Sequence, residues 1–183
     1  MEGTSTEHHL APWMIESAYR YLTAAQHLSR GYDMLGVAQV NAAIGIEILL
    51  KSFISKPNGN HGLANETYKL DQAAIKKSHQ LLQAQGKVAK GSRIDRHDLL
   101  TLFHAVPEPL RRRIRLDRHE QCLHHYRNVF TTARYPYEQT SPKGYDDILI
   151  SILAELVVNV VQWYRDQGSK DIFIVCHGMQ PKR

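Results

Sequence analysis

Cysteine pairs, long hydrophobic runs and strong charge of one sign are all missing from this sequence, and each absence argues against a class of protein. The chain of 183 residues has only two cysteines, Cys122 and Cys176, which lie far apart. A disulfide-stapled secreted scaffold is therefore not expected, and a reducing compartment is. No apolar run approaches the roughly 18 residues of a membrane span, and the first residues lack a basic-then-apolar secretion signal. We expect a cytoplasmic protein without a membrane segment.

Several catalytic signatures are missing as well. No glycine-rich loop has phosphate-binding spacing, and no serine or cysteine nucleophile has a supporting partner. Segment 119–124, HEQCLH, is close to a zinc-protease helix, but Leu123 stands where the second histidine of that motif belongs. His119 and Cys122 would need Cys176 or His177 to complete a metal site, and two buried side chains are the simpler interpretation. We expect neither a metal nor a cofactor.

The charge that is present is modestly basic. Lys and Arg total 23 against 18 for Asp and Glu, which gives a formal net charge of +5, and 11 histidines can add to it as the pH falls. This balance favours a polyanionic partner such as RNA, although the charge density is far below that of a histone tail. An ordinary soluble protein with a slightly basic surface is an equal alternative.

Apolar residues recur at helical spacing along most of the chain and predict an all-α fold. The apolar run AAIGIEILL marks the second helix, capped by Asp33, as the most buried one. The tail, 169–183, alternates like a strand at an edge or dimer contact. Long helices with short connections predict one domain over 1–183, an antiparallel helical bundle with its core in 11–168. Helices are expected over 12–30, 33–54, 65–86, 98–106, 117–136 and 146–167, and Asp95 or Asp98 can cap the helix at 98–106.

Segment 117–138, DRHEQCLHHYRNVFTTARYPYE, carries the most chemistry. On a helix that turns about 100° per residue, its apolar and its polar side chains gather on opposite faces. Arginine binds phosphate through two donors and histidine moves a proton near neutral pH, so the polar face suits RNA or a nucleotide. A merely solvated face is the alternative. The apolar face comprises Leu116, Leu123, Tyr126, Val129, Phe130 and Ala133, and the polar face comprises Glu120, His124, Arg127, Asn128, Thr131 and Arg134.

Two other charged features need an explanation. Glu47 lies within the most apolar helix, where an unpaired carboxylate would be costly to bury. Its partner is expected to be Lys51, one turn later, or an arginine of segment 117–136. The four arginines of segment 110–116, together with the basic loop 86–95, form either a groove that follows a phosphate backbone or an exposed basic turn.

The order of these elements resembles the HEPN family (higher eukaryotes and prokaryotes nucleotide-binding domain) over roughly residues 11–168. The resemblance rests on the run Glu47-Ile48-Leu49-Leu50-Lys51, on His97-Asp98-Leu99 and on Arg134-Tyr135-Pro136. It implies a compact bundle that usually dimerises and that in many members is a metal-independent endoribonuclease of the toxin or defence type, with an antitoxin as partner. In those members an arginine is followed, four to six positions later, by a histidine, and the motifs of two subunits form one cleft.

Two frames of that motif are present in part. Arg127-Asn128 matches its start, but no histidine follows at the required distance, whereas Arg118 and His124 satisfy the spacing earlier in the segment. The Arg-Tyr-Pro ending resembles the branch of the family that binds nucleotides without cutting RNA. We therefore expect a homodimer that binds RNA or a nucleotide, with endoribonuclease activity as a further step, or else a non-catalytic interaction module. The resemblance assigns Arg118 and His124 as catalytic residues, and Arg127, Asn128, Arg134 and Tyr135 as ligand-binding residues.

Overall fold

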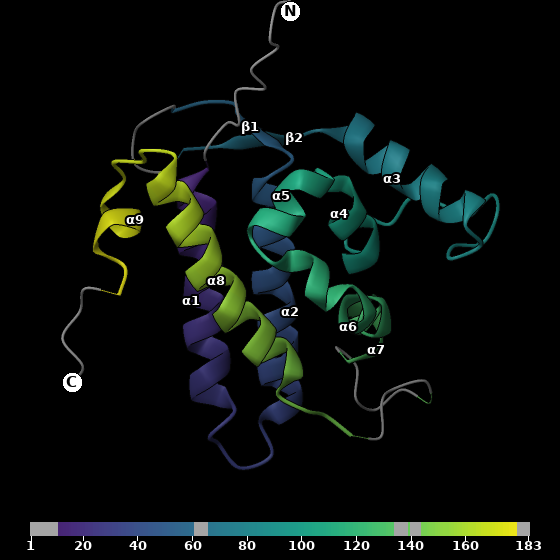
Figure 1. Cartoon of the computed structure of the whole chain (residues 1–183). Coiled ribbons are helices and arrows are strands. Elements are labelled where there is room, and N and C mark those ends of the chain that lie inside the picture. Colours follow the sequence, from purple (N-terminus) through teal and green to yellow (C-terminus); the bar gives the residue numbers. More distant parts are fainter. Residues whose placement is uncertain (1–10, 61–65, 134–138, 140–143, 179–183) are drawn as a thin grey trace, which may run out of the picture.

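Long helices build the centre of the molecule. The computed structural model describes residues 11–60, 66–133, 139 and 144–178, and these residues are mostly helical. Helices α1 (Pro12–Leu28), α2 (Leu35–Ser52) and α8 (Ile148–Asp166), which we call the long-helix group, share one hydrophobic core. Helices α1 and α2 lie side by side and α8 packs against both (Figure 1). The predicted all-α class is confirmed for the described residues.

The centre of α2 is the closest approach within the long-helix group. A Cβ atom on Gly45 would collide with a methyl group of Leu153 in α8 and would come within 3.2 Å of the carbonyl oxygen of Ala18 in α1. Only glycine allows this packing. At the far end of α8, burial raises the pKa of Tyr164 to about 12, and its hydroxyl accepts a hydrogen bond of 3.0 Å from the backbone N–H of Ala11. The prediction that α2 is the most buried helix agrees with these contacts.

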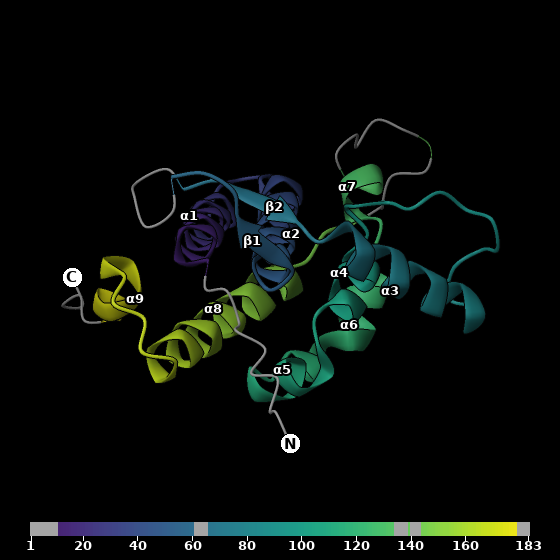
Figure 2. The same ribbon diagram turned by 90° about the horizontal axis from the view of Figure 1, so that it is seen from above.

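Shorter elements lie on the side of α2 opposite to α1 (Figure 2). The antiparallel strands β1 (Ser55–Pro57) and β2 (Tyr68–Leu70) lead into them. They are α3 (Gln72–Ala84), α4 (Leu99–Ala105), α5 (Glu108–Arg113), the 3-10 helix η1 (Leu116–His119), α6 (Glu120–His125) and α7 (Val129–Thr132). We call residues 72–132 the short-element group. A last helix, α9 (Ile172–Cys176), follows α8.

Some predicted boundaries were wrong. Asp33 does not cap α2, because its backbone has a positive φ of 56° and the helix begins only after Met34. The peripheral helix starts at Gln72 rather than at 65, because β2 pairs with β1 and Asp71 then caps α3. The tail does not form a strand where it is described, since Asp171 accepts a hydrogen bond from the backbone N–H of Ile174 and starts α9.

Segment 117–136, predicted as one helix, is broken into η1, α6 and α7 with a turn at residues 126–128. The side chains of that turn bind residues that are distant in the sequence: the Tyr126 hydroxyl donates to Asp146, and Arg127 pairs with Asp98. Burial raises the pKa of Tyr126, and the hydrogen bond to Asp146 raises it further. Because the helix is interrupted, the predicted polar face is not one surface. Arg134 and Tyr135 lie outside the described residues.

Helices α2 and α8 are long and apolar enough to cross a membrane by length and composition alone, which the sequence analysis did not anticipate. In each of them 56% of the apolar window is buried inside the structure. Core helices of globular proteins share these properties, so the two helices are explained by the core that they form with α1.

Candidate functional site

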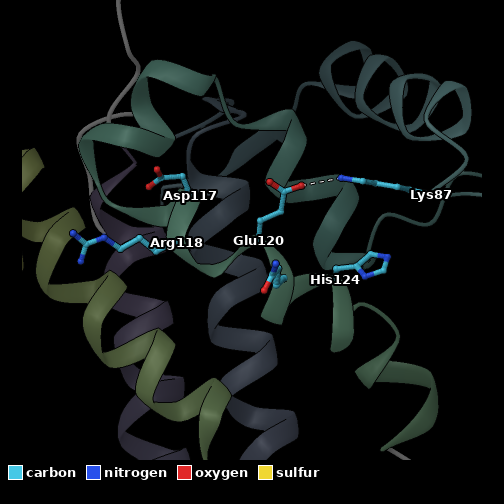
Figure 3. Close-up of a pocket in the computed structure, with 6 residues that line it drawn as sticks. Lys87, Asp117, Arg118, Glu120 and His124 are labelled. Atoms are coloured by element: carbon cyan, nitrogen blue, oxygen red, sulfur yellow. Dashed lines mark hydrogen bonds and ion pairs between the residues drawn. The ribbon is translucent and has the colours of Figure 1, made fainter.

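An open pocket of about 620 Å³ lies beside η1 and α6. It brings together Arg118 and His124, the pair that the motif spacing predicted, although their side chains extend in opposite directions with Glu120 between them (Figure 3). The loop after α3 contributes Lys87, which belongs to the basic loop 86–95 that was predicted either to help form a phosphate groove or to be an exposed basic segment. The lining residues are Lys87, Asp117, Arg118, Glu120, Gln121 and His124.

Glu120 is the anchored carboxylate of this pocket. Lys87 Nζ donates to its Oε1 over 3.0 Å, and His104 Nε2 lies 3.2 Å from the same oxygen. The hydrogen bond from Lys87 holds the pKa of Glu120 below its usual range, and burial lowers the pKa of His104. The lining has two cations, Lys87 and Arg118, and two carboxylates, Asp117 and Glu120, so its formal charge is balanced while His124 is neutral.

Arg118 and His124 are both exposed, and neither makes a hydrogen bond or ion pair with another residue in the described part of the chain. Lys87, by contrast, already shares its charge with Glu120. The exposed side chains of Asp117 and Gln121 are unpaired in the same way among the described residues, so the cationic or proton-carrying groups that a ligand would meet unpaired are the Arg118 guanidinium and the His124 imidazole. Both groups suit a phosphate-bearing ligand.

Arg127, predicted to bind a ligand, is committed to an internal ion pair. Its Nε and Nη2 donate to the two carboxylate oxygens of Asp98 over 3.1 and 2.5 Å, and its Nη1 donates to the carbonyl oxygen of Lys87 over 2.7 Å. The Arg127 side chain is 16% exposed and that of Asp98 is 7% exposed. Asp98 also caps α4 and accepts a hydrogen bond from Thr101. Arg127 therefore holds α4, the turn before α7 and the Lys87 loop together.

Asn128 is exposed in the turn beside Arg127, while Arg134 and Tyr135 lie outside the described residues. Their contact with a ligand stays a prediction. Asp98 was expected only as a cap, because no sequence signal shows that a cap residue also binds an arginine distant in the chain.

Glu47 has the predicted partner and a second one. Lys51 forms an ion pair with its carboxylate, as the spacing indicated. The second partner is His97, whose Nδ1 lies 3.0 Å from Oε1 and 3.2 Å from Oε2 of Glu47. The alternative was an arginine of segment 117–136, and of these Arg127 binds Asp98 rather than Glu47.

The arginines of segment 110–116 mostly turn to internal partners. Arg111 donates to the carbonyl oxygen of Val106 over 2.8 Å, and its guanidinium lies over the Phe103 ring. Arg112 pairs with Glu108 and Arg113 pairs with Asp166. These contacts favour the alternative of a basic turn over a groove that follows a phosphate backbone.

Metal chemistry gains no support from the described residues, which contain no group of three or more His, Cys, Asp and Glu side chains placed to hold an ion. His119 lies 3.4 Å from Glu155 in α8, an ion-pair distance without hydrogen-bond geometry. Cys122 and Cys176 are both free thiols.

Comparisons with family models, with curated proteins and with solved structures found no match to this chain. The HEPN resemblance therefore stays a prediction, and function has to be argued from the site itself.

Proposed function

We propose that this chain is an HEPN-like antiparallel helical bundle that binds RNA or a nucleotide in the pocket beside η1 and α6, as a cytoplasmic homodimer. The observation that carries the proposal is the placement of Arg118 and His124 on one pocket, exposed and without a partner among the described residues. Guanidinium and imidazolium groups donate charge-assisted hydrogen bonds to phosphate oxygens. Lys87 lies at the rim of the same pocket, paired with Glu120.

Endoribonuclease activity is the further step of this proposal. His124 would move the proton of a reacting hydroxyl, and Arg118 would steady the charge that develops on the phosphate. The two side chains of one subunit extend away from each other (Figure 3). A second copy of the chain that placed its arginine beside His124 would complete the pair, which supports the homodimer. An antitoxin partner belongs to the proposal through the family resemblance alone.

A binding titration tests the proposal. A fluorescently labelled single-stranded RNA of mixed sequence, and separately ATP, are titrated with the full chain at two salt concentrations. Phosphate binding predicts that affinity falls as salt rises and that Arg118→Ala weakens it by about tenfold. Arg112→Ala is the matched control, because Arg112 pairs with Glu108 outside the pocket. Absence of salt-dependent binding to both ligands removes the proposal.

Cleavage requires its own control. If the RNA is cut and Arg118 and His124 are the catalytic pair, His124→Ala should abolish cutting, whereas His27→Ala, a change of an exposed histidine on α1, should not. Equal loss in both variants, or no loss in either, removes Arg118 and His124 as the catalytic pair.

A non-catalytic interaction module is the second candidate function. It is favoured by apolar side chains on the outer surface: Val158 of α8 is 60% exposed and Ile172 of α9 is 80% exposed. Such residues are often covered by another protein when they gather in one patch. If Val158→Glu separates an assembly into monomers and the protein binds neither RNA nor ATP, this second function is the correct one.

A further inference from the structure

His97 is an exposed histidine whose ring is fixed by a buried carboxylate. Its side chain is 62% exposed, whereas that of Glu47 is 10% exposed. The Nδ1 atom faces both carboxylate oxygens of Glu47, at 3.0 and 3.2 Å. The backbone N–H of His97 donates to Asp95 over 2.8 Å. The ring of Phe130 in α7 packs against the His97 ring, with 6.0 Å between the ring centroids. The imidazole is thus contacted by side chains of two helices, α2 and α7, while the backbone of His97 is tied to its own loop.

The contact with Glu47 also decides which nitrogen of His97 is reactive. A carboxylate only accepts hydrogen bonds, so Nδ1 must carry the proton and the neutral ring keeps its free lone pair on Nε2. Nε2 makes no hydrogen bond with any residue that the structure describes. Lys51 pairs with the same carboxylate and so compensates its charge within the fold. A carboxylate that fixes the tautomer of an accessible histidine is the arrangement that proton-transfer sites use.

The position of His97 gives this dyad a role. Arg127-Asn128 matches the start of the cleavage motif, but the histidine that should follow in the sequence is missing. His97 is the neighbour of Asp98, which binds Arg127, and its ring contacts Phe130, three residues beyond Arg127. The loop that leads to His97 carries exposed cations, and none of them forms an ion pair with a described residue: Lys90, Arg93 and Arg96.

We propose that Glu47 and His97 form a proton-transfer dyad that supplies, from another part of the chain, the histidine that the Arg127 motif lacks. The substrate class is single-stranded RNA, and in this respect the inference rests on the proposed function. Arg127 and Glu47 are positioning residues, because each acts through a neighbour. His97 is the catalytic base, since its Nε2 meets the reacting hydroxyl. It takes the step that the proposed function gives to His124, and Arg118 and His124 then bind the RNA without moving a proton.

The reaction is balanced without an oxidant or a reductant. Nε2 of His97 takes the proton of an RNA 2′-hydroxyl while the 2′-oxygen bonds to the adjacent phosphorus. The bond between phosphorus and the 5′-oxygen breaks, and water gives a proton to that oxygen. The products are a 2′,3′-cyclic phosphate and a 5′-hydroxyl, and the imidazolium returns its proton to solvent. Loop cations next to His97 would stabilise the phosphate charge.

The test follows cleavage and binding of one labelled single-stranded RNA by the full chain, with DNA of the same sequence as a substrate without the 2′-hydroxyl. In His97→Gln a polar side chain remains beside Glu47 but moves no proton. Cleavage should slow by about 100-fold or more, while the affinity for RNA is unchanged. His97→Ala should recover part of its activity when imidazole is added, an effect that a structural role does not produce. His27→Gln is the matched control and should cut at the wild-type rate.

The role of Glu47 has a separate readout. Nitrogen-15 NMR of the wild type should show the neutral His97 ring with its proton on Nδ1, and Glu47→Gln should give a mixture of tautomers. Should Glu47→Gln unfold because Lys51 loses its partner, His97→Gln and imidazole rescue still decide.

Two outcomes overturn the dyad and leave the binding function standing. One is RNA that binds but is never cut, and the other is His97→Gln that cuts as fast as His27→Gln. If the chain binds no RNA at all, the proposed function fails and the dyad fails with it.

Discussion

The long-helix group and the short-element group share one hydrophobic core, but the second group adds ion pairs between distant residues. In the first, α1, α2 and α8 meet through apolar side chains that have almost no exposed surface, with Leu153 packed against Gly45. In the second, buried apolar side chains such as Phe103 and Leu123 belong to the same core, and ion pairs between distant residues are added, above all the buried pair of Asp98 and Arg127. The apolar contacts provide a rigid support, and Arg127 also holds the loop of Lys87 beside the pocket. The candidate functional groups therefore lie in the group that has these additional charged contacts.

The buried pair of Asp98 and Arg127 should give the largest effect in the short-element group. Asp98→Ala leaves the Arg127 guanidinium buried without its carboxylate, and we expect a loss of about 3–5 kcal/mol in the free energy of unfolding. Urea unfolding measures this loss. Adding Arg127→Met should restore part of it, because the unpaired charge is removed. A double variant as unstable as Asp98→Ala alone would mean that the pair does not hold this group together.

Overpacking at Gly45 should give a smaller effect in the long-helix group. Gly45→Ala places a methyl group against Leu153 and the Ala18 carbonyl oxygen, which should cost about 1–3 kcal/mol in unfolding free energy. In a Leu153→Ala background the same change should cost less, since the main obstacle is gone. Equal costs in the two backgrounds, measured by urea unfolding, would refute the close packing of α2 on α8.

The dependence of stability on pH should come partly from His104 in the short-element group. Burial lowers its pKa in the folded protein from the usual 6.5, so the unfolded chain binds more protons once the pH falls below 6.5. The contribution of neutral His104 to stability is therefore complete above pH 6.5, and it is lost as the pH falls through the pKa of His104 in the folded protein. His177 has a pKa shift of the same sign. Thermal unfolding of His104→Gln should therefore depend on pH less steeply than that of the wild type, and an unchanged slope would contradict this.

The smallest change in stability should follow the loss of Lys87, although its effect on binding should be clear. Its ion pair with Glu120 is more than a third exposed, so Lys87→Ala should cost about 0–1 kcal/mol. If RNA phosphates contact Lys87, the logarithmic dependence of RNA affinity on salt should become shallower by about one charge. An unchanged salt dependence would place the RNA away from this rim of the pocket.

The same division separates what the sequence could predict from what it could not. Helical periodicity was sufficient for α1, α2 and α8, because each buries a continuous apolar stripe whose spacing is local information. Asp98 was likewise readable as the cap of α4. Periodicity failed at residues 126–128, because the partners that break the helix, Asp98 and Asp146, lie elsewhere in the sequence.

The site was predictable to a similar degree. The spacing of Arg118 and His124 predicted that they belong together, and they do line one pocket. It could not show that their side chains extend in opposite directions, because the segment is divided between η1 and α6. The contact between Glu47 and His97 was not predicted either, since no local pattern links residues so far apart in the chain.

The most direct measurement is NMR of the backbone amides while single-stranded RNA is added to the full chain. Binding by the short-element group predicts that shifts concentrate in the loop after α3 and in η1 and α6, around Lys87, Arg118 and His124. The backbone amide signals of α1, α2 and α8 should not shift. Amide shifts confined to α8 and α9, or no shifts at all at low salt, would contradict the claim that the short-element group is the functional part of the molecule.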